Sequence, residues 1–155
     1  MRALRDTITD RTAHVAVIGL GYVGLPLATA FARAGFRVTG IDIDAGKVEA
    51  IGAGRSYIPD VPDEELAPHV ESGRLSATSD YDALADADAL FICVPTPYDV
   101  QRAPDLSFIR SASESIRSRL IPGQLVVLQS TTYPGTTEEV VLPILEESGL
   151  TAGED

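Results

Sequence analysis

The sequence predicts an α/β domain in which helices cover both faces of a doubly wound parallel sheet, a three-layer α/β/α arrangement. Short, β-branched apolar runs alternate along the chain with longer segments whose apolar residues have helical spacing. Continuous apolar runs are typical of strands buried on both faces, as in parallel sheets. The 155 residues, 45% of them hydrophobic and 23% charged, are enough for one domain with an ordinary core.

The first part of the chain predicts a strand–helix–strand unit. Residues 14–19 form an apolar run that is too short for a helix, and residues 22–34 follow with helical spacing and a stop at Gly35. Residues 36–41 form a second apolar run, which ends at Asp42. Because such units pack right-handed with parallel strands, these two strands are expected to be neighbours in one sheet.

The remainder of the chain continues the alternation. The predicted elements are helices at 45–51 and 63–71, a strand at 75–78, a turn capped by Asp80, a strand at 89–94, a helix at 106–120, a strand at 124–130 and a helix at 136–149. In the last helix, Thr136 and Glu139 have capping-box spacing and Pro143 is expected to produce a kink. Residues 1–13 are polar and predict a mobile tail or a short helical turn. Since another strand would normally follow, we interpret residues 14–155 as a domain that stops before its last strand, in the front part of a longer protein.

Charge and cysteine content exclude several classes of protein. The 12 basic and 23 acidic side chains give a net charge of −11, which argues against nucleic-acid or anionic-membrane partners, because both require positive potential. A single cysteine excludes a disulfide framework and a cysteine-rich metal site. No apolar stretch approaches the ~18 residues of a membrane span, and the polar start lacks the apolar core of a signal peptide. We therefore expect a soluble cytoplasmic protein.

The turn between the first predicted strand and its helix carries a G-x-G-x-x-G pattern, Gly19-Leu20-Gly21-Tyr22-Val23-Gly24. In this context Gly19 permits the tight turn, Gly21 lets the backbone approach a pyrophosphate, and Gly24 lets the helix pack close to the strand. The amides of residues 20–23 and the helix N-terminus would bind the diphosphate. An acid, Asp42, ends the next strand. The alternative, a purely structural glycine turn, leaves Asp42 unexplained, so a dinucleotide-binding, Rossmann-like domain is predicted.

Asp42 also indicates which dinucleotide is bound. A carboxylate at this position can accept hydrogen bonds from both ribose hydroxyls and repels a 2′-phosphate. Position 43 is Ile43, no arginine is near, and Asp44 adds negative charge, so NAD is favoured over NADP. Asp44 is interpreted as the cap of the following helix. Lys47 is either a cation beside the ribose or adenine, or a solvated surface lysine.

Two further loops are expected at the cofactor, because ligands bind where the strand order reverses. The loop after the fourth strand contains Pro95 and Thr96, whose hydroxyl either contacts the cofactor or only completes a turn. After the fifth strand, Ser130 and Thr131 suit the nicotinamide side of the site. Two threonines that follow, Thr132 and Thr136, are more readily interpreted as capping the last helix than as contacting the cofactor.

The other titratable groups predict no catalytic or metal site in this chain. Cys93 lies inside an apolar strand and is interpreted as an inert core thiol. His14 begins the first strand, at the end opposite the glycine turn, and His69 lies in a polar helix. Neither histidine has a partner at catalytic or metal-ligand spacing.

Four segments together resemble the UDP-glucose/GDP-mannose dehydrogenase family: Gly19–Ala28 (GLGYVGLPLA), Gly40–Asp44 (GIDID), Val94–Pro97 (VPTP) and Ser130–Thr137 (STTYPGTT). The resemblance covers nearly everything from His14 onward. It implies NAD contacts by the backbone of Val23 and by four side chains, Asp42, Lys47, Thr96 and Thr131.

The resemblance also implies what the whole protein does. Members of this family oxidise the 6-hydroxyl of a nucleotide sugar to a carboxylate in two NAD-dependent steps, and the segment 130–137 looks most like the branch that acts on UDP-N-acetylhexosamines. The family's catalytic cysteine, lysine and asparagine lie in a later substrate domain, which this chain lacks. In members of the family, a glutamate in a Ser-Pro-Glu-Arg-like segment follows soon after the position that corresponds to Asp155. We therefore expect this chain to bind NAD without catalysing alone, and the full-length protein to bind a UDP-sugar and form a homo-oligomer.

Two alternatives remain open on the sequence. The cofactor domain of a β-hydroxyacid dehydrogenase begins with a similar strand and helix, but such domains usually favour NADP and carry Asn-Arg after the second strand, unlike residues 41–44. A non-catalytic NAD-sensing or interaction module would be naturally short. The encoding gene distinguishes the second alternative, because an open reading frame that continues past Asp155 with the family's later motifs excludes it.

Overall fold

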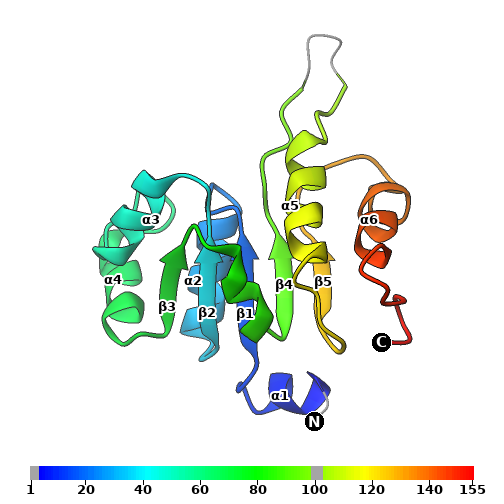
Figure 1. Ribbon diagram of the computed structural model, residues 1–155. Helices are drawn as coiled ribbons and strands as arrows, with labels where there is room; N and C mark the ends of the chain where they lie inside the picture. Colours follow the sequence, from blue (N-terminus) through cyan, green and yellow to red (C-terminus); the bar gives the residue numbers. More distant parts are fainter. Residues whose placement is uncertain (1–3, 99–102) are drawn as a thin grey trace.

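The computed structural model describes residues 4–98 and 103–155. A five-stranded parallel sheet runs through it in the order β3-β2-β1-β4-β5 (Figure 1). The strands are β1 (His14–Ile18), β2 (Arg37–Ile41), β3 (Leu75–Thr78), β4 (Ala89–Ile92) and β5 (Leu125–Leu128). In the central strand, Ile18 pairs with Ile41 of β2 on one side and with Ile92 of β4 on the other. The predicted doubly wound sheet is thereby confirmed, and its order is that of a Rossmann-like domain.

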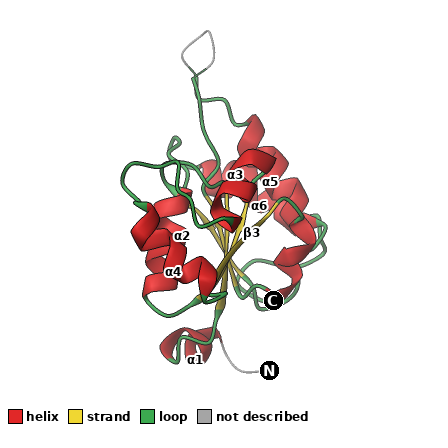
Figure 2. Cartoon of the chain, turned by 90° about the vertical axis from the view of Figure 1, so that its left-hand side faces the viewer, coloured by secondary structure: helices red, strands yellow, loops and turns green. Residues whose placement is uncertain are grey.

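Helices form a layer on each face of the sheet. They are α2 (Gly24–Arg33), α3 (Ala45–Gly52), α4 (Asp63–Glu71), the 3-10 helix η1 (Tyr81–Asp86), α5 (Ser107–Arg117), the π-helical turn η2 (Thr137–Val141) and α6 (Leu142–Glu146). A further helix, α1 (Leu4–Thr9), lies outside these layers (Figure 1). Figure 2 shows the sheet nearly edge-on, with α2 and α4 on one side and α5 and α6 on the other. No helix in the described ranges is both long and apolar enough to cross a bilayer.

The central strand supplies both cores, because successive side chains of a strand point to opposite faces. All five residues of β1 are buried. Val15 and Val17 belong to the core beneath α2, whereas Ala16 and Ile18 belong to the core beneath α5. This two-sided burial explains why the strand is a continuous apolar run, and it fixes the position of the turn that follows Ile18.

The N-terminal segment and the element boundaries differ in detail from the expectations. Leu4–Thr9 is a short helix below the amino ends of the strands (Figure 1), so within the described residues the helical alternative for the polar segment is confirmed; residues 1–3 of that segment lie outside the description. The helix predicted from residue 22 begins at Gly24, because residues 19–23 form the turn that connects it to β1. The turn after Asp80 is confirmed, since the Asp80 carboxylate accepts a hydrogen bond from the amide of Asp82.

The predicted capping box of the last helix is wrong. Thr136 has helical backbone angles, φ −56° and ψ −36°, whereas an N-cap residue is extended. Its hydroxyl donates to the carbonyl of Tyr133 at 2.8 Å and lies 3.0 Å from the Thr132 hydroxyl, so these hydroxyls stabilise the turn before the helix. The Thr136 side chain makes no hydrogen bond to the first helical amides, so its expected role as a cap of the last helix is corrected to a role in this turn. Pro143 lies in the first turn of α6, where its missing N–H is tolerated, directly after the π-helical turn; the kink expected at this position stays a prediction.

Candidate cofactor-binding site

The three central strands end next to one another and direct their loops to one edge of the sheet. Strand order reverses at β1, because the chain crosses from β1 to β2 and β3 on one side and then returns to β4 and β5 on the other. The loops that begin at Gly19, Asp42 and Cys93 therefore meet above the carboxyl ends of β1, β2 and β4 (Figure 1). In open α/β sheets ligands bind at this crevice.

The glycines of the first turn have three different environments. Gly19 has a φ of +90°, and a β-carbon there would lie 2.6 Å from the carbonyl oxygen of Cys93, so only glycine fits. A β-carbon on Gly24 would lie 1.6 Å from the carbonyl oxygen of Gly19, so glycine lets α2 start against the turn. Around Gly21, in contrast, no atom lies within 4 Å of the β-carbon position. Two glycines are therefore required by packing, whereas Gly21 leaves open space beside the backbone.

The helix that begins at this turn has an uncapped N-terminus. Val23 precedes α2 without a side-chain hydrogen bond to the first helical amides. The first turn of an α-helix has N–H groups without intrahelical acceptors and carries the positive end of the helix dipole. An anion adjacent to the glycine turn would be stabilised by both features.

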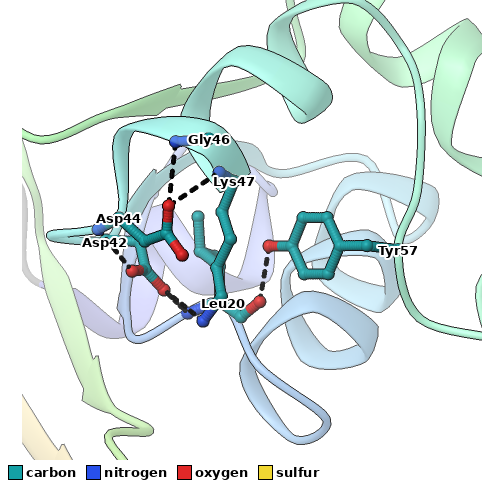
Figure 3. Close-up of polar contacts among 6 residues, drawn as sticks. All are labelled: Leu20, Asp42, Asp44, Gly46, Lys47 and Tyr57. Carbon is teal, nitrogen blue, oxygen red and sulfur yellow. Dashed lines mark hydrogen bonds and ion pairs between the residues drawn. The ribbon is translucent and has the colours of Figure 1, made fainter.

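Asp42 is anchored by the backbone on two sides. Its Oδ2 accepts the N–H of Leu20 at 2.8 Å, and its Oδ1 accepts the N–H of Asp44 at 2.9 Å (Figure 3). The side chain is only 7% exposed. Since a carboxylate has about four acceptor positions, capacity for further donors remains. The Leu20 N–H is already bound, so the prediction that this amide donates to the diphosphate is corrected: Leu20 instead holds the carboxylate.

Lys47 and Asp44 complete the charged part of the site. The Asp44 carboxylate accepts the amides of Gly46 and Lys47 at the start of α3, which confirms its predicted capping role. Lys47 Nζ lies 3.4 Å from Oδ2 of Asp42, with its side chain 34% exposed. The lysine is therefore part of the Asp42 site and not an isolated surface cation.

A cavity of about 260 Å³ lies beside Asp42. Tyr81 of η1 lines it, and its apolar walls come from Ile41, Ile43, Val94, Pro95, Phe108 and Ala112. Burial, and then the charge of Asp42, raise the pKa of Tyr81, so its hydroxyl stays protonated. The cavity combines apolar walls with one buried carboxylate, that of Asp42. A second cavity, of about 270 Å³, lies at the edge strand β5 beside α6 and contains none of the predicted site residues.

The hydroxyls after β4 and β5 join the two loops to one another. The Thr96 hydroxyl donates to the carbonyl of Thr131 at 2.6 Å, and the Ser130 hydroxyl donates to the carbonyl of Val94 at 2.7 Å. The structure thus brings Thr96, Ser130 and Thr131 together. These hydrogen bonds use the hydroxyl protons, so the oxygens of Thr96 and Ser130 are left as acceptors.

Sequence reasoning missed Tyr57. It lies in the loop between α3 and α4, and its hydroxyl donates to the carbonyl of Leu20 at 2.6 Å (Figure 3). The Lys47 ammonium lies 6.0 Å from the centre of its ring. A single tyrosine in a loop that contains glycine and proline belongs to no helical or strand pattern, so the sequence does not predict its position. Only the tertiary fold shows where its hydroxyl lies.

The remaining chemistry-bearing residues lie away from this edge or are buried. His14 is 5% exposed at the amino end of β1, where its ring contacts the carbonyl of Asp86 and the hydroxyl of Thr39. Cys93 is 6% exposed, and burial raises the pKa of its thiol to about 11, in agreement with an inert core thiol. Within residues 4–98 and 103–155, no group of three or more His, Cys, Asp or Glu side chains could hold a metal ion.

A glycine turn at the strand-order reversal, an anchored acid at the end of β2 and a cavity beside it define a dinucleotide-binding domain. Residues 13–154 match the UDP-glucose/GDP-mannose dehydrogenase family, NAD binding domain. The chain belongs to this family, and NAD is its cofactor. The family resemblance of the four sequence segments is confirmed.

Similar proteins include two curated dehydrogenases and a solved structure. A UDP-N-acetyl-D-glucosamine 6-dehydrogenase of Pseudomonas aeruginosa is 42% identical over 142 residues, which are 91% of this chain and 33% of that protein. A UDP-N-acetyl-D-mannosamine dehydrogenase of Yersinia pestis is 44% identical over 128 residues, 81% of this chain and 30% of that protein. The crystal structure of a GDP-mannose dehydrogenase from P. aeruginosa superposes with a TM-score of 0.86 at 36% identity, covering 91% of this chain and 34% of that chain. The chain therefore spans about a third of the length of these relatives.

Proposed function

We propose that the crevice between the glycine turn and Asp42 binds NAD, with the diphosphate at the turn and the adenosine ribose at Asp42. The observation that carries this proposal is the buried Asp42 carboxylate, which two backbone N–H groups fix at the end of β2 next to the open space at Gly21. A fixed carboxylate with spare acceptor positions suits a pair of vicinal hydroxyls. The open space beside Gly21 would let a phosphate approach the backbone closely.

The residues assigned to this site are the predicted set, with Leu20 now in a supporting role. They are Gly19, Leu20, Gly21, Tyr22, Val23, Gly24, Asp42, Lys47, Pro95, Thr96, Ser130 and Thr131. The amides of Gly21, Tyr22 and Val23 would donate to the diphosphate, together with the N-terminus of α2. The apolar cavity walls would contact the adenine, since Ile43 is 76% and Phe108 38% exposed beside Asp42.

Charge in this crevice supports NAD over NADP. Asp42 and Asp44 lie beside one cation, Lys47, which already contacts Asp42. A 2′-phosphate at the Asp42 carboxylate would meet a buried negative charge, and bringing like charges together in a site with little solvent is costly. Bound NAD supplies the nicotinamide ring that accepts a hydride, and the residues of this chain bind and orient it.

For the whole protein we infer a nucleotide-sugar dehydrogenase that oxidises the 6-hydroxyl of a UDP-sugar to a carboxylate. The supporting observations are the family membership and the names of relatives, which include dehydrogenases of UDP-N-acetyl-D-glucosamine and UDP-N-acetyl-D-mannosamine. These names favour a UDP-N-acetylhexosamine as substrate and a role in polysaccharide biosynthesis. We also propose a cytoplasmic homo-oligomer that contacts neither nucleic acid nor membrane; the net charge of −11 is consistent with the last point.

Calorimetric titration with NAD tests the site. Asp42→Ala should weaken NAD binding by about 1–3 kcal/mol, because hydrogen bonds to a charged acceptor are lost. Asp60→Ala removes an exposed carboxylate from the loop before α4 and should leave the affinity unchanged. Absence of NAD binding by the unmodified chain, or equal affinity of the Asp42→Ala variant, would refute the proposal.

A second titration separates ribose recognition from a general loss of structure. Asp42 also accepts two backbone amides, so its removal could disturb the turn. Disturbance alone would weaken NAD and NADP equally. Loss of a carboxylate that repels a 2′-phosphate should instead raise the affinity for NADP relative to NAD.

A further inference from the structure

Leu20 is held from both of its peptide bonds. Its N–H donates to Asp42 at 2.8 Å, and its carbonyl accepts the Tyr57 hydroxyl at 2.6 Å. Figure 3 shows Tyr57 and Asp42 reaching Leu20 from different sides. The Leu20 side chain is 1% exposed and packs where a β-carbon on Gly40 would lie 2.7 Å from it. Leu20 is therefore held in place by two hydrogen bonds and by packing, and Gly21, which has open space beside it, follows directly.

Fixing the Leu20 carbonyl also fixes the next amide. The peptide between Leu20 and Gly21 is planar and trans, so its N–H points opposite to its C=O. Because the carbonyl points to Tyr57, the Gly21 N–H is directed to the side of the peptide away from Tyr57. Gly21 has no side chain, and no atom lies within 4 Å of its β-carbon position, so its own packing does not set this orientation.

The tyrosine is suited to act as a permanent donor. Burial, followed by the charges of Asp42 and Asp44, raises the pKa of Tyr57, so the hydroxyl keeps its proton throughout the physiological range. Lys47 contacts Asp42 at 3.4 Å and lies 6.0 Å from the centre of the Tyr57 ring, which links the two anchors of Leu20 through one side chain. Tyr57 therefore comes from a distant loop but is part of the same polar cluster as Asp42.

We propose that Tyr57 is a positioning residue for the dinucleotide: it holds the Leu20–Gly21 peptide in the orientation in which the Gly21 amide donates to the diphosphate. This inference rests on the proposed NAD site and adds a residue that acts on the diphosphate half of it. Tyr57 acts through the carbonyl of Leu20, so its effect is on phosphate recognition and not on recognition of the nucleoside.

The test is Tyr57→Phe, which removes only the hydroxyl, with Tyr98→Phe as the matched control because Tyr98 is 76% exposed on the loop after β4. NAD, ADP and adenosine are titrated into ¹⁵N-labelled protein. Tyr57→Phe should weaken NAD and ADP by about 3- to 10-fold, the effect of removing one neutral hydrogen bond, and should change adenosine affinity less than about twofold. Equal weakening of all three ligands, or of none, would overturn the proposal.

The orientation of the Gly21 N–H without ligand examines the positioning directly. The one-bond ¹H–¹⁵N residual dipolar coupling of Gly21 reports this orientation; it should change in Tyr57→Phe, and Tyr98→Phe should leave it unchanged. An unchanged Gly21 coupling in Tyr57→Phe rejects the positioning role even if NAD binds. Absence of NAD binding by the unmodified chain, in contrast, would reject the proposed NAD site itself.

Discussion

The carbonyl oxygen of Gly19 lies 1.6 Å from the point that a β-carbon on Gly24 would occupy. No ordinary side-chain movement can relieve this overlap, because the contact is with backbone. The start of α2 and the end of β1 are thus packed as closely as glycine allows, and the turn between them is held rigidly.

Alanine substitutions of the glycines should therefore separate packing from ligand binding. Gly24→Ala should lower the free energy of unfolding by more than about 1–3 kcal/mol, the usual cost of overpacking. That corresponds to a fall in Tm of about 2–4 °C per kcal/mol for a chain of this length. Gly21→Ala, with open space at its β-carbon position, should keep its Tm and lose affinity for NAD by about tenfold, ~1.4 kcal/mol. Thermal unfolding and calorimetry measure the two effects.

Gly52→Ala is the control for the same chemical change. Gly52 ends α3, and its β-carbon position also has no atom within 4 Å. This variant should be as stable as the unmodified chain or slightly more stable, since alanine has the higher helix propensity. If Gly24→Ala proved equally harmless, the close packing of the turn would be disproved.

Local sequence patterns were sufficient to predict the fold and part of the site. The apolar run at His14–Ile18 and the glycine pattern are local signals, and the place of Asp42 at the end of the next strand follows from the strand–helix–strand unit; the doubly wound rule then sets the strand order. Tyr57 could not be predicted, because its hydrogen bond to Leu20 joins residues 37 positions apart. The prediction of a capping box at Thr136 was wrong. The residue types have the right spacing, but the backbone of Thr136 is already helical and not extended as an N-cap requires.

His14 should make stability depend on pH. Asp86 offers a carbonyl at 2.9 Å from Nδ1, so Nδ1 carries the proton and Nε2 accepts the Thr39 hydroxyl at 2.8 Å. Burial is the main cause that lowers the pKa of His14 below 6.5, and Arg37 acts in the same direction, whereas the Asp86 carbonyl and the charges of Asp88 and Asp86 oppose it. The unfolded chain therefore takes up this proton at a higher pH than the folded chain, and the stability that neutral His14 contributes is lost as pH falls below about 6.5.

Urea unfolding between pH 7 and pH 5 measures this dependence. His14→Asn should be less stable than the unmodified chain at pH 7 by about 1–3 kcal/mol, because buried hydrogen bonds are lost. It should also show a smaller decrease in stability on acidification. His69→Asn removes the other histidine of the chain and should keep the original slope; a slope unaffected by His14→Asn would contradict the assignment.

Cys93 should be nearly unreactive in the folded protein. Burial raises the pKa of its thiol from 9.0 to about 11, which leaves about 100-fold less thiolate at pH 8. A disulfide reagent should therefore label the native chain at least about 100-fold more slowly than the chain in denaturant. Because the chain has one cysteine, the whole signal reports on this residue. Rapid labelling of the native chain would show that the thiol is accessible.

The 155-residue chain should not oxidise a sugar by itself. A two-step oxidation of an alcohol to a carboxylate needs a base for the hydroxyl and, in the covalent route that the family resemblance implies, a reactive thiolate for the aldehyde. Cys93 is buried with a raised pKa, and His14 is buried at the amino ends of the strands, so neither meets these needs at the Asp42 edge. With NAD and UDP-N-acetylglucosamine or UDP-glucose, absorbance at the NADH wavelength should stay at the level of the protein-free control. The same mixture should nevertheless give a calorimetric NAD signal, and steady NADH formation that depends on the UDP-sugar would refute the prediction.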